Sequence, residues 1–361
     1  MMLERHASSP FLDPASVDVW DAWFRLREGG ELCDLSIEST WQRVAKAMAC
    51  DAGTCDGPVT DRCFEALARW QLLLDERILA GAGSVREQWP EDPVAVLNLA
   101  AFVQAPFTTH ARVDYPALRD VAEVAVCCLG CTSSHRTDKT CAPRIGMIGI
   151  ADALALLGLR YDSQGGRDMA GNMARAVAEG CLTANIRQAR QHGRLVDCDP
   201  DLRAHMTSRG MPADLIREAA HSGLRYRQLS VITSQRRLAL FANNVSDALD
   251  PLCPGAAVRP SARGSTAPAA AGYAATVARL VPTHDATTQF AIAQEEVTVP
   301  DQIRLRGAVQ PSIDTPIDYP VRVRQAPDAH SLASWRELAK AYSIGPLRLE
   351  IEPDLCGHVS G

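Results

Sequence analysis

The segment RIGMIGIADALALLGLRYDS, from Arg144 to Ser163, carries the clearest structural signal in the chain. Its first part, Arg144 to Ile150, is mainly apolar and predicts a strand or the end of one. The run that follows, Ala151 to Leu157, predicts a helix that stops at Gly158, a residue typical of helix C-termini. This segment therefore predicts a strand that leads directly into a helix.

Further elements are predicted on both sides of this segment. Apolar residues recur at helical spacing in several stretches, and Ser36 is a candidate N-cap. The expected helices are Val17 to Arg27, Ser36 to Met48, Arg62 to Leu74, Tyr115 to Leu129, and Arg167 to His192 with Gly193 as its C-cap. Leu229 to Ile232 is typical of a strand.

Length and charge limit the classes of function. The chain has 361 residues, 47% of them hydrophobic, enough for one large core or for two or three domains of ordinary size. Its 37 basic and 43 acidic side chains give a formal net charge of −6. Such a chain lacks the broad positive field that non-specific nucleic-acid binding needs, so we expect no direct nucleic-acid partner. A local arginine cluster could still hold a few phosphates.

We expect a cytoplasmic protein without a membrane partner. The opening MMLERHASSPFLDP has no apolar core after its basic residues and does not resemble a secretory signal. The most apolar stretches, Pro93 to Val103 and Gly146 to Leu159, are interrupted by Asn98 and Asp152 and are too short to span a bilayer. The 12 cysteines are therefore expected to be reduced thiols.

The composition changes sharply between Pro254 and Thr276, where Pro, Gly, Ala and Ser dominate. Such a stretch buries too little apolar surface to order itself, so residues 254–276 are predicted to be a flexible linker. The linker separates a main body from a C-terminal segment, residues 277–361.

One cluster has the composition of a metal site. Cys128, Cys131, His135 and Cys141 lie close together in the sequence and are ligand types that tetrahedral zinc accepts. A redox-sensitive thiol cluster and cysteines with no special role are the alternatives, because no second CxxC follows at zinc-finger spacing.

Six segments, taken in order, resemble the large chain of ribonucleotide reductase, and especially its adenosylcobalamin-dependent class. They are WDAWFRLREGGELCDLSIESTWQRVA (20–45), FEALARWQLLLDERILAGAG (64–83), NLAAFV (98–103), RIGMIGIADALALLGLRYDS (144–163), LSVITSQRRLALFANNVSDALDP (229–251) and LRGAVQPSIDT (305–315). The resemblance implies a helix-rich α/β fold that is a partial or remodelled reductase barrel. It also implies an N-terminal helical region (1–83), a barrel remnant (84–253) and adenosylcobalamin as cofactor.

The thiols that this chemistry requires are missing from the expected place. The family reduces ribose with a radical cysteine and two reducing cysteines, and it places the radical-cysteine loop shortly before the NLAAFV segment. Here the stretch from Gly83 to Asn98 contains no cysteine, and Asp92 stands about where a reducing cysteine is expected. The C-terminal segment has only Cys356, so it offers no cysteine pair to relay reducing equivalents.

The phosphate site is also altered. The family holds the substrate phosphate in a turn of small residues, and the corresponding residues here run from Gln235 to Leu238. Arg236 and Arg237 could replace that turn by gripping a phosphate with charge-assisted hydrogen bonds. The alternative is a solvated basic turn.

These observations lead to three hypotheses. The first is a reductase-like protein without reductase activity that binds a nucleotide or phosphate, or acts on a partner such as a complete reductase chain. The second is an enzyme, either a reductase completed by a partner chain or a protein with a new activity. The third is a zinc-stabilised structural or interaction protein. An incomplete barrel would expose sheet edges, and for that reason we also expect a homodimer.

Overall fold

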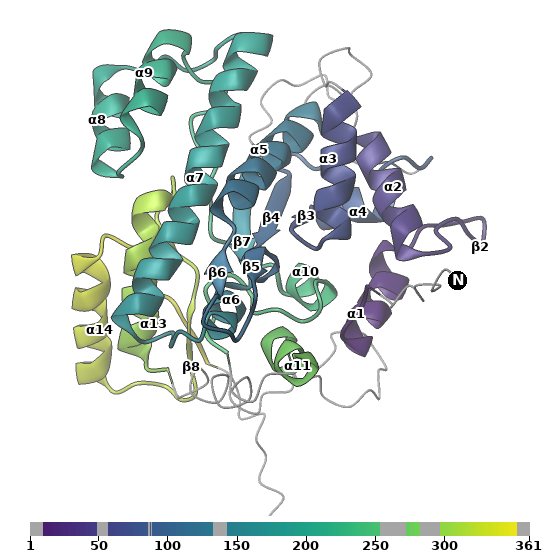
Figure 1. Cartoon of the computed structure of the whole chain (residues 1–361). Helices are drawn as coiled ribbons and strands as arrows, with labels where there is room; N and C mark the ends of the chain where they lie inside the picture. Colours follow the sequence, from purple (N-terminus) through teal and green to yellow (C-terminus); the bar gives the residue numbers. More distant parts are fainter. Residues whose placement is uncertain are drawn as a thin grey trace, which may run out of the picture.

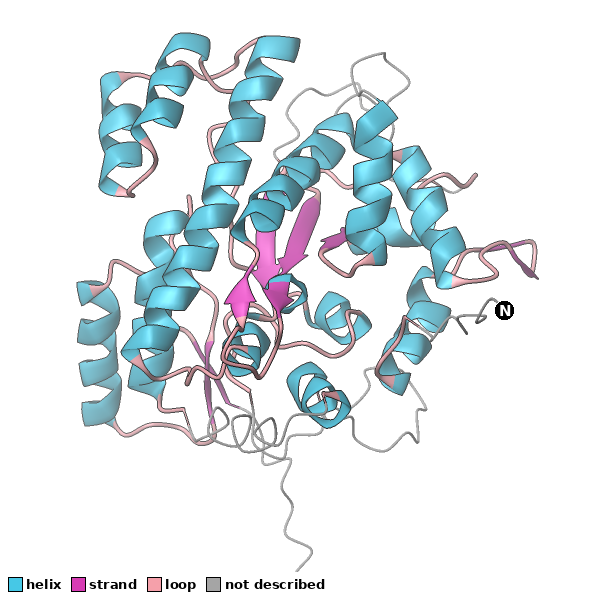
Figure 2. Ribbon diagram, viewed as in Figure 1, coloured by secondary structure: helices cyan, strands magenta, loops and turns pink. Residues whose placement is uncertain are grey.

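The computed structural model describes residues 10–48, 57–85, 87, 89–132, 143–252, 272–281 and 297–351. A three-stranded sheet lies at the centre, with helices around it (Figure 2). Its strands are β3 (Leu72–Leu74), β4 (Val94–Asn98) and β7 (Arg144–Ile148). β4 and β7 are parallel, and β3 pairs with β4 in the antiparallel sense. The predicted strand at Arg144 is therefore confirmed.

The segment around Ser230 extends this sheet beyond β7. Ser230 forms an isolated parallel bridge with Ile145, and the Ile145 amide donates to the Leu229 carbonyl at 2.7 Å. The three parallel segments thus have their carboxyl ends at one edge of the sheet, which we call the carboxyl edge, and their starts at the opposite, amino edge.

Helix α5 (Tyr115–Thr132) connects the carboxyl end of β4 to the start of β7. It is preceded by a short 3-10 helix (Leu99–Phe102) and by a hairpin of β5 (Val103–Gln104) and β6 (Arg112–Val113). A helix between two parallel strands runs back along the sheet, so the last turns of α5 lie toward the amino edge.

The long helix α7 (Gln164–His192) packs against α5, and Figure 1 shows the two side by side. Gly180 makes the approach close, because a Cβ atom there would lie 2.4 Å from the Arg119 carbonyl oxygen. Helix α6 (Ile150–Leu156) lies between β7 and α7 in the chain, and Gly158 follows it with a φ of 69°. Both bounds of α6 lie one residue before those predicted. Helix α7 begins at Gln164 rather than Arg167, and its end at His192 with Gly193 as C-cap is as predicted.

The N-terminal region is helical, as predicted, but two boundaries differ. Its elements are α1 (Pro14–Val19), a π-helical turn (Trp20–Phe24), the hairpin β1 (Arg27–Glu28) and β2 (Glu31–Leu32), α2 (Ile37–Ala47), α3 (Gly57–Ala68) and α4 (Glu76–Gly81). The first predicted helix ends at Phe24 rather than Arg27. The helix predicted over Arg62 to Leu74 ends at Ala68, and its last residues form β3. Trp70, with a φ of 58°, breaks the helix between them.

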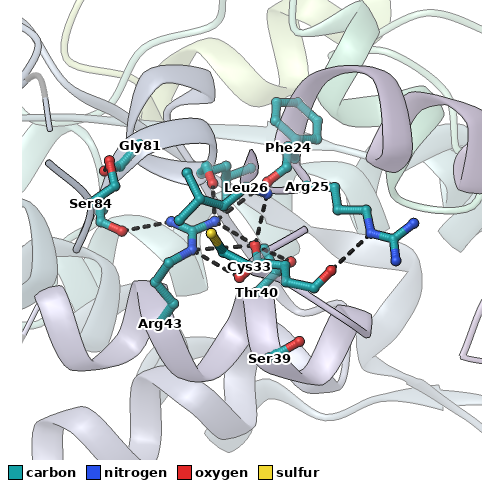
Figure 3. Close-up of polar contacts among 12 residues, drawn as sticks. Phe24, Arg25, Leu26, Cys33, Ser39, Thr40, Arg43, Gly81 and Ser84 are labelled. Atoms are coloured by element: carbon teal, nitrogen blue, oxygen red, sulfur yellow. Dashed lines mark hydrogen bonds and ion pairs between the residues drawn. The ribbon is translucent and has the colours of Figure 1, made fainter. Parts of the chain in front are cut away.

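A buried ion pair fastens this region together. Asp34 accepts hydrogen bonds from Arg43 Nη2 at 2.8 Å, from the Thr40 hydroxyl at 2.8 Å and from the Leu26 amide at 3.1 Å. Arg43 also donates to the carbonyls of Ala82 and Leu79, at 2.6 and 3.0 Å. Figure 3 shows Arg43, Thr40 and Leu26 facing one another around these contacts. Helix α2 is thereby tied to α4 and to the chain before β1.

Aromatic rings join the N-terminal region to α10 (Arg236–Phe241). The Trp70 ring meets the rings of Trp41 and Phe241 edge-on, with centroids 5.4 and 5.1 Å apart. The predicted N-terminal region and barrel remnant therefore share one core.

The C-terminal segment also joins this core. It comprises α13 (Val299–Val309), a 3-10 turn (Gln310–Ser312), β8 (Val321–Val323), α14 (Ala329–Ala341) and β9 (Leu349–Ile351). Helix α13 packs on α7, and its Leu305 and Val309 are fully buried in the main core. Helix α11 (Tyr273–Leu280) begins inside the predicted linker, so its residues 273–276 are helical; residues 253–271 lie outside the described structure. The reason is a contact that composition does not show, the Ala274 amide donating to the buried Asp152.

The described residues form a mixed α/β protein whose sheets are small, and they contain no closed barrel. All three residues of β3 are fully buried, so the chain itself covers this edge strand. The exposed edge from which we expected a homodimer is thus not present at β3, and the homodimer stays a prediction. In the described parts of the chain, no helix is both long enough and apolar enough to cross a bilayer.

Candidate functional site

The carboxyl edge of the sheet is the first place to look for a site, because open α/β sheets bind ligands outside the carboxyl ends of their strands. Asn98 ends β4, Gly149 follows β7, and Ser234 follows the segment that pairs with β7. Helices α6, α10 and α11 gather at this end of the sheet in Figure 1.

Asp152, in the first turn of α6, is fully buried at this edge. Its carboxylate accepts hydrogen bonds from the Ser246 amide at 2.6 Å and from the Ala274 amide at 3.1 Å. Burial raises the pKa of the Asp152 carboxyl, and these hydrogen bonds oppose that shift only in part. The side chain holds the loop after α10 and the start of α11 onto α6.

Asn98 is the most unusual polar residue of the edge. Its side chain is 1% exposed, and neither amide atom has a hydrogen-bond partner among the described residues. Gly149 lies beside it in a left-handed conformation, and a Cβ at Gly149 would be 2.6 Å from Asn98 Oδ1. An unsatisfied buried amide is costly, so this amide is a candidate partner for a water molecule or a ligand atom.

Two further buried carboxylates link the edge to the C-terminal segment. Asp247 accepts from the Ser234 hydroxyl and the Gln235 amide, both at 2.7 Å. Asp250 accepts from the Tyr319 hydroxyl at 2.7 Å and pairs with Arg322 at 2.5 Å.

Burial raises the pKa of the Asp250 carboxyl, the charge of Arg322 opposes this shift, and neighbouring Asp247 adds to it. The carboxylates of Asp152, Asp247 and Asp250, in contrast to the Asn98 amide, are thus hydrogen-bonded within the protein. In this arrangement they connect elements that are distant in the sequence.

The structure places Arg236 and Arg237 at the start of α10 but does not bring them to a common point. Arg236 Nη2 contacts both carboxylate oxygens of Glu350 at 2.5 Å. Arg237 pairs with Glu76 and lies over the Trp23 ring, 3.8 Å from its centroid. Arg237 is therefore part of the packing, whereas the half-exposed Arg236 can be reached by a ligand that competes with Glu350.

Three buried thiols, those of Cys127, Cys128 and Cys181, lie toward the amino edge of the sheet. Cys127 and Cys128 are in the last turns of α5, which approach the amino edge, and both are buried. Cys181 of α7 is buried beside Leu229 and Ser230, the residues that flank the start of β7. Burial raises the pKa of the Cys181 thiol, which keeps it protonated and unreactive.

The predicted zinc site falls largely outside the described residues. Cys128 is fully buried in α5, and the backbone of Cys131 continues that helix, but His135 and Cys141 lie outside the description. Within the described part of the chain, no cluster of three or more His, Cys, Asp or Glu side chains could hold a metal ion. Zinc binding stays a prediction.

Sequence reasoning missed most of the buried polar residues of the edge. Asn98 and Asp152 were visible only as interruptions of apolar runs, and that interruption is the signal that could have marked them. Tyr319 and Arg322 carry no local signal, because their partner Asp250 is far away in the sequence. No protein-family model matches the chain, and no curated protein matches it either.

Proposed function

We propose that this chain is a ribonucleotide-reductase-like protein without radical reductase activity. The observation that carries the proposal is the position of the thiols relative to the sheet. The resemblance implies that a reductase gathers its cysteines around the substrate, and the carboxyl edge is where an open α/β sheet binds a ligand. Here that edge is lined by Asn98, Asp152 and Asp247, whereas Cys127, Cys128 and Cys181 lie toward the other end.

The order of elements supports the reductase-like part of the proposal. The NLAAFV and RIGMIG segments that carry the resemblance are the end of β4 with its 3-10 helix and the whole of β7. β4 and β7 are paired in parallel, and α5 lies between them in the chain, as is expected of neighbouring strands in an α/β barrel. We interpret this unit as a remodelled barrel remnant. Buried polar side chains occupy its carboxyl edge, where we would expect the substrate of a reductase.

Adenosylcobalamin does not fit the described residues as a radical source. Such a cofactor needs a thiol beside the substrate to receive the radical, and no described cysteine is found among the buried polar side chains of the carboxyl edge. We therefore derive no step through this cofactor.

A retained anion site at Arg236 is the second part of the proposal. Arg236 is 54% exposed; its Nη2 contacts Glu350 at 2.5 Å, and its Nε lies 4.0 Å from Asp247. A nucleoside diphosphate could take the place of the Glu350 carboxylate, because phosphate oxygens can accept the hydrogen bonds that Arg236 Nη2 donates to Glu350.

Competition with Glu350 provides the test. Glu350→Gln removes the competing charge and should tighten nucleoside diphosphate binding by up to about fivefold, since an exposed ion pair is worth up to about 1 kcal/mol. Arg236→Ala should abolish the binding. Arg304→Ala, which removes an arginine paired with Asp301 elsewhere on the surface, is the matched control and should change nothing. Calorimetric titration measures all three, and equal affinity of wild type and Arg236→Ala would reject the site.

A further inference from the structure

A cavity lies toward the amino edge of the sheet, in a part of the chain to which the proposed function assigns nothing. Helices α8 (Pro200–Ser208) and α9 (Ala213–Ser222) form a small helical pair beside the C-terminal half of α7 (Figure 1). Between α7, α8 and the extended segment 224–230 is a pocket of about 370 Å³. This is the size of pocket that holds small organic ligands.

The floor of the pocket is apolar. Leu182 of α7, Met206 of α8, Met211 and Leu224 line it, and each is less than 9% exposed. The protonated thiol of Cys181 adds to this surface. Methionine side chains adapt to different shapes and make favourable contacts between sulfur and aromatic rings. The floor therefore suits a compact apolar group, in particular an aromatic ring.

The polar wall of the pocket is built from a segment clamped at both ends. At one end, Asn185 Oδ1 accepts from the amides of Arg225 and Tyr226 at 2.8 and 2.9 Å. At the other end, Asp314 Oδ2 accepts from the amides of Leu229 and Ser230 at 2.7 and 2.9 Å. A backbone held in this way needs no further ordering when a ligand binds, so the cost that is left is that of ordering the side chains.

Arg227 and Gln228 lie between the two clamps and line the pocket. Neither side chain makes a hydrogen bond or ion pair with another described residue, in contrast to Arg209, which pairs with Asp314 at 2.5 Å. The guanidinium of Arg227 is thus a cation that lines the pocket and forms no ion pair with a described residue. Its planar fork matches a carboxylate.

Charge decides between a carboxylate and a phosphate. Asp199 and Asp201 also line the pocket and add negative charge to its rim. These carboxylates repel a phosphate dianion about twice as strongly as a monoanion, and Arg227 is the one lining arginine without an ion pair among the described residues. We propose that this pocket binds a small apolar monocarboxylate, with its carboxylate on Arg227 and its apolar body on the Leu182, Met206 and Leu224 floor.

The test uses 3-phenylpropanoate as the probe in calorimetric titrations with the full chain. We expect saturable binding to wild type and a loss of at least about tenfold in affinity for Arg227→Ala. Arg203→Ala, an equal charge change on α8 outside the pocket lining, should bind within about twofold of wild type. Both substitutions are at exposed positions, so both variants should fold.

Two matched ligands test the chemistry. The neutral 3-phenylpropanamide has the same shape and should bind at least about tenfold more weakly than 3-phenylpropanoate. Phenyl phosphate, a dianion at pH 8, should also bind more weakly. Absence of saturable binding, equal affinity of Arg227→Ala and wild type, or tighter binding of phenyl phosphate than of 3-phenylpropanoate would each overturn the proposal.

Discussion

Replacing Asp34 by alanine should destabilise the protein by about 3 kcal/mol, because it leaves the charge of Arg43 buried without its partner. The Asp34 and Arg43 side chains are 3% and 11% exposed, so solvent cannot replace the lost carboxylate. Removing one member of a buried ion pair costs about 3–5 kcal/mol. We choose the lower end because Arg43 keeps its hydrogen bonds to the Ala82 and Leu79 carbonyls.

Asp21→Ala is the matched control. Asp21 also pairs with arginines in the N-terminal region, but its side chain is 46% exposed, so its loss should cost less than about 1 kcal/mol. Urea unfolding followed by tryptophan fluorescence gives both free energies of unfolding. If Asp34→Ala cost no more than Asp21→Ala, the Asp34–Arg43 pair would not fasten the N-terminal region as we describe.

Three other predictions concern packing and pH. Gly180→Ala should cost about 2 kcal/mol because its Cβ would clash with the α5 backbone, whereas Gly165→Ala, with its nearest contact at 3.8 Å, should be neutral or stabilising in thermal melts. Arg306→Lys should cost about 2 kcal/mol in urea, because an ammonium cannot reproduce the guanidinium's hydrogen bonds to two separate carbonyls. Burial alone would raise the pKa of Asp34, but its hydrogen bonds from Arg43, Thr40 and Leu26 lower it overall. The stability from Asp34 should therefore be complete above about pH 4 and be lost as the pH falls through the lowered value, and Asp34→Asn should remove this part of the acid sensitivity measured from pH 2 to 6.

The elements that local signals mark were predictable. The ends of α6 and α7 are marked by residues that follow them closely in the sequence, Gly158 and Gly193, whose φ angles are positive. The N-cap of α2 at Ser36 was visible for the same reason, since its side chain bonds to the nearby Ser39 amide. Such helix ends can be predicted from one sequence because the contacts that form them are between residues close together in the chain.

Features that depend on distant partners were not predictable. The three leucines of β3 were predicted as the end of a helix, because three consecutive apolar residues show neither a helical nor a strand period. They form a strand because they pair with β4. The Asp152 contact with Ala274 spans 122 residues, and it makes a helix start inside a stretch whose composition predicts a linker. The ion pairs of Arg236 and Arg237 depend on Glu350 and Glu76 in the same way.

Product formation tests the central proposal most directly. Purified chain is incubated with ribonucleoside di- and triphosphates, adenosylcobalamin and a dithiol, beside a complete adenosylcobalamin-dependent reductase as positive control, and deoxyribonucleotides are quantified by mass spectrometry. We predict no product above the enzyme-free blank, because Cys127, Cys128 and Cys181 lie toward the amino edge and not at the carboxyl edge, where we expect the sugar to bind. Deoxyribonucleotide formation that depends on the chain and on the cofactor would contradict this account.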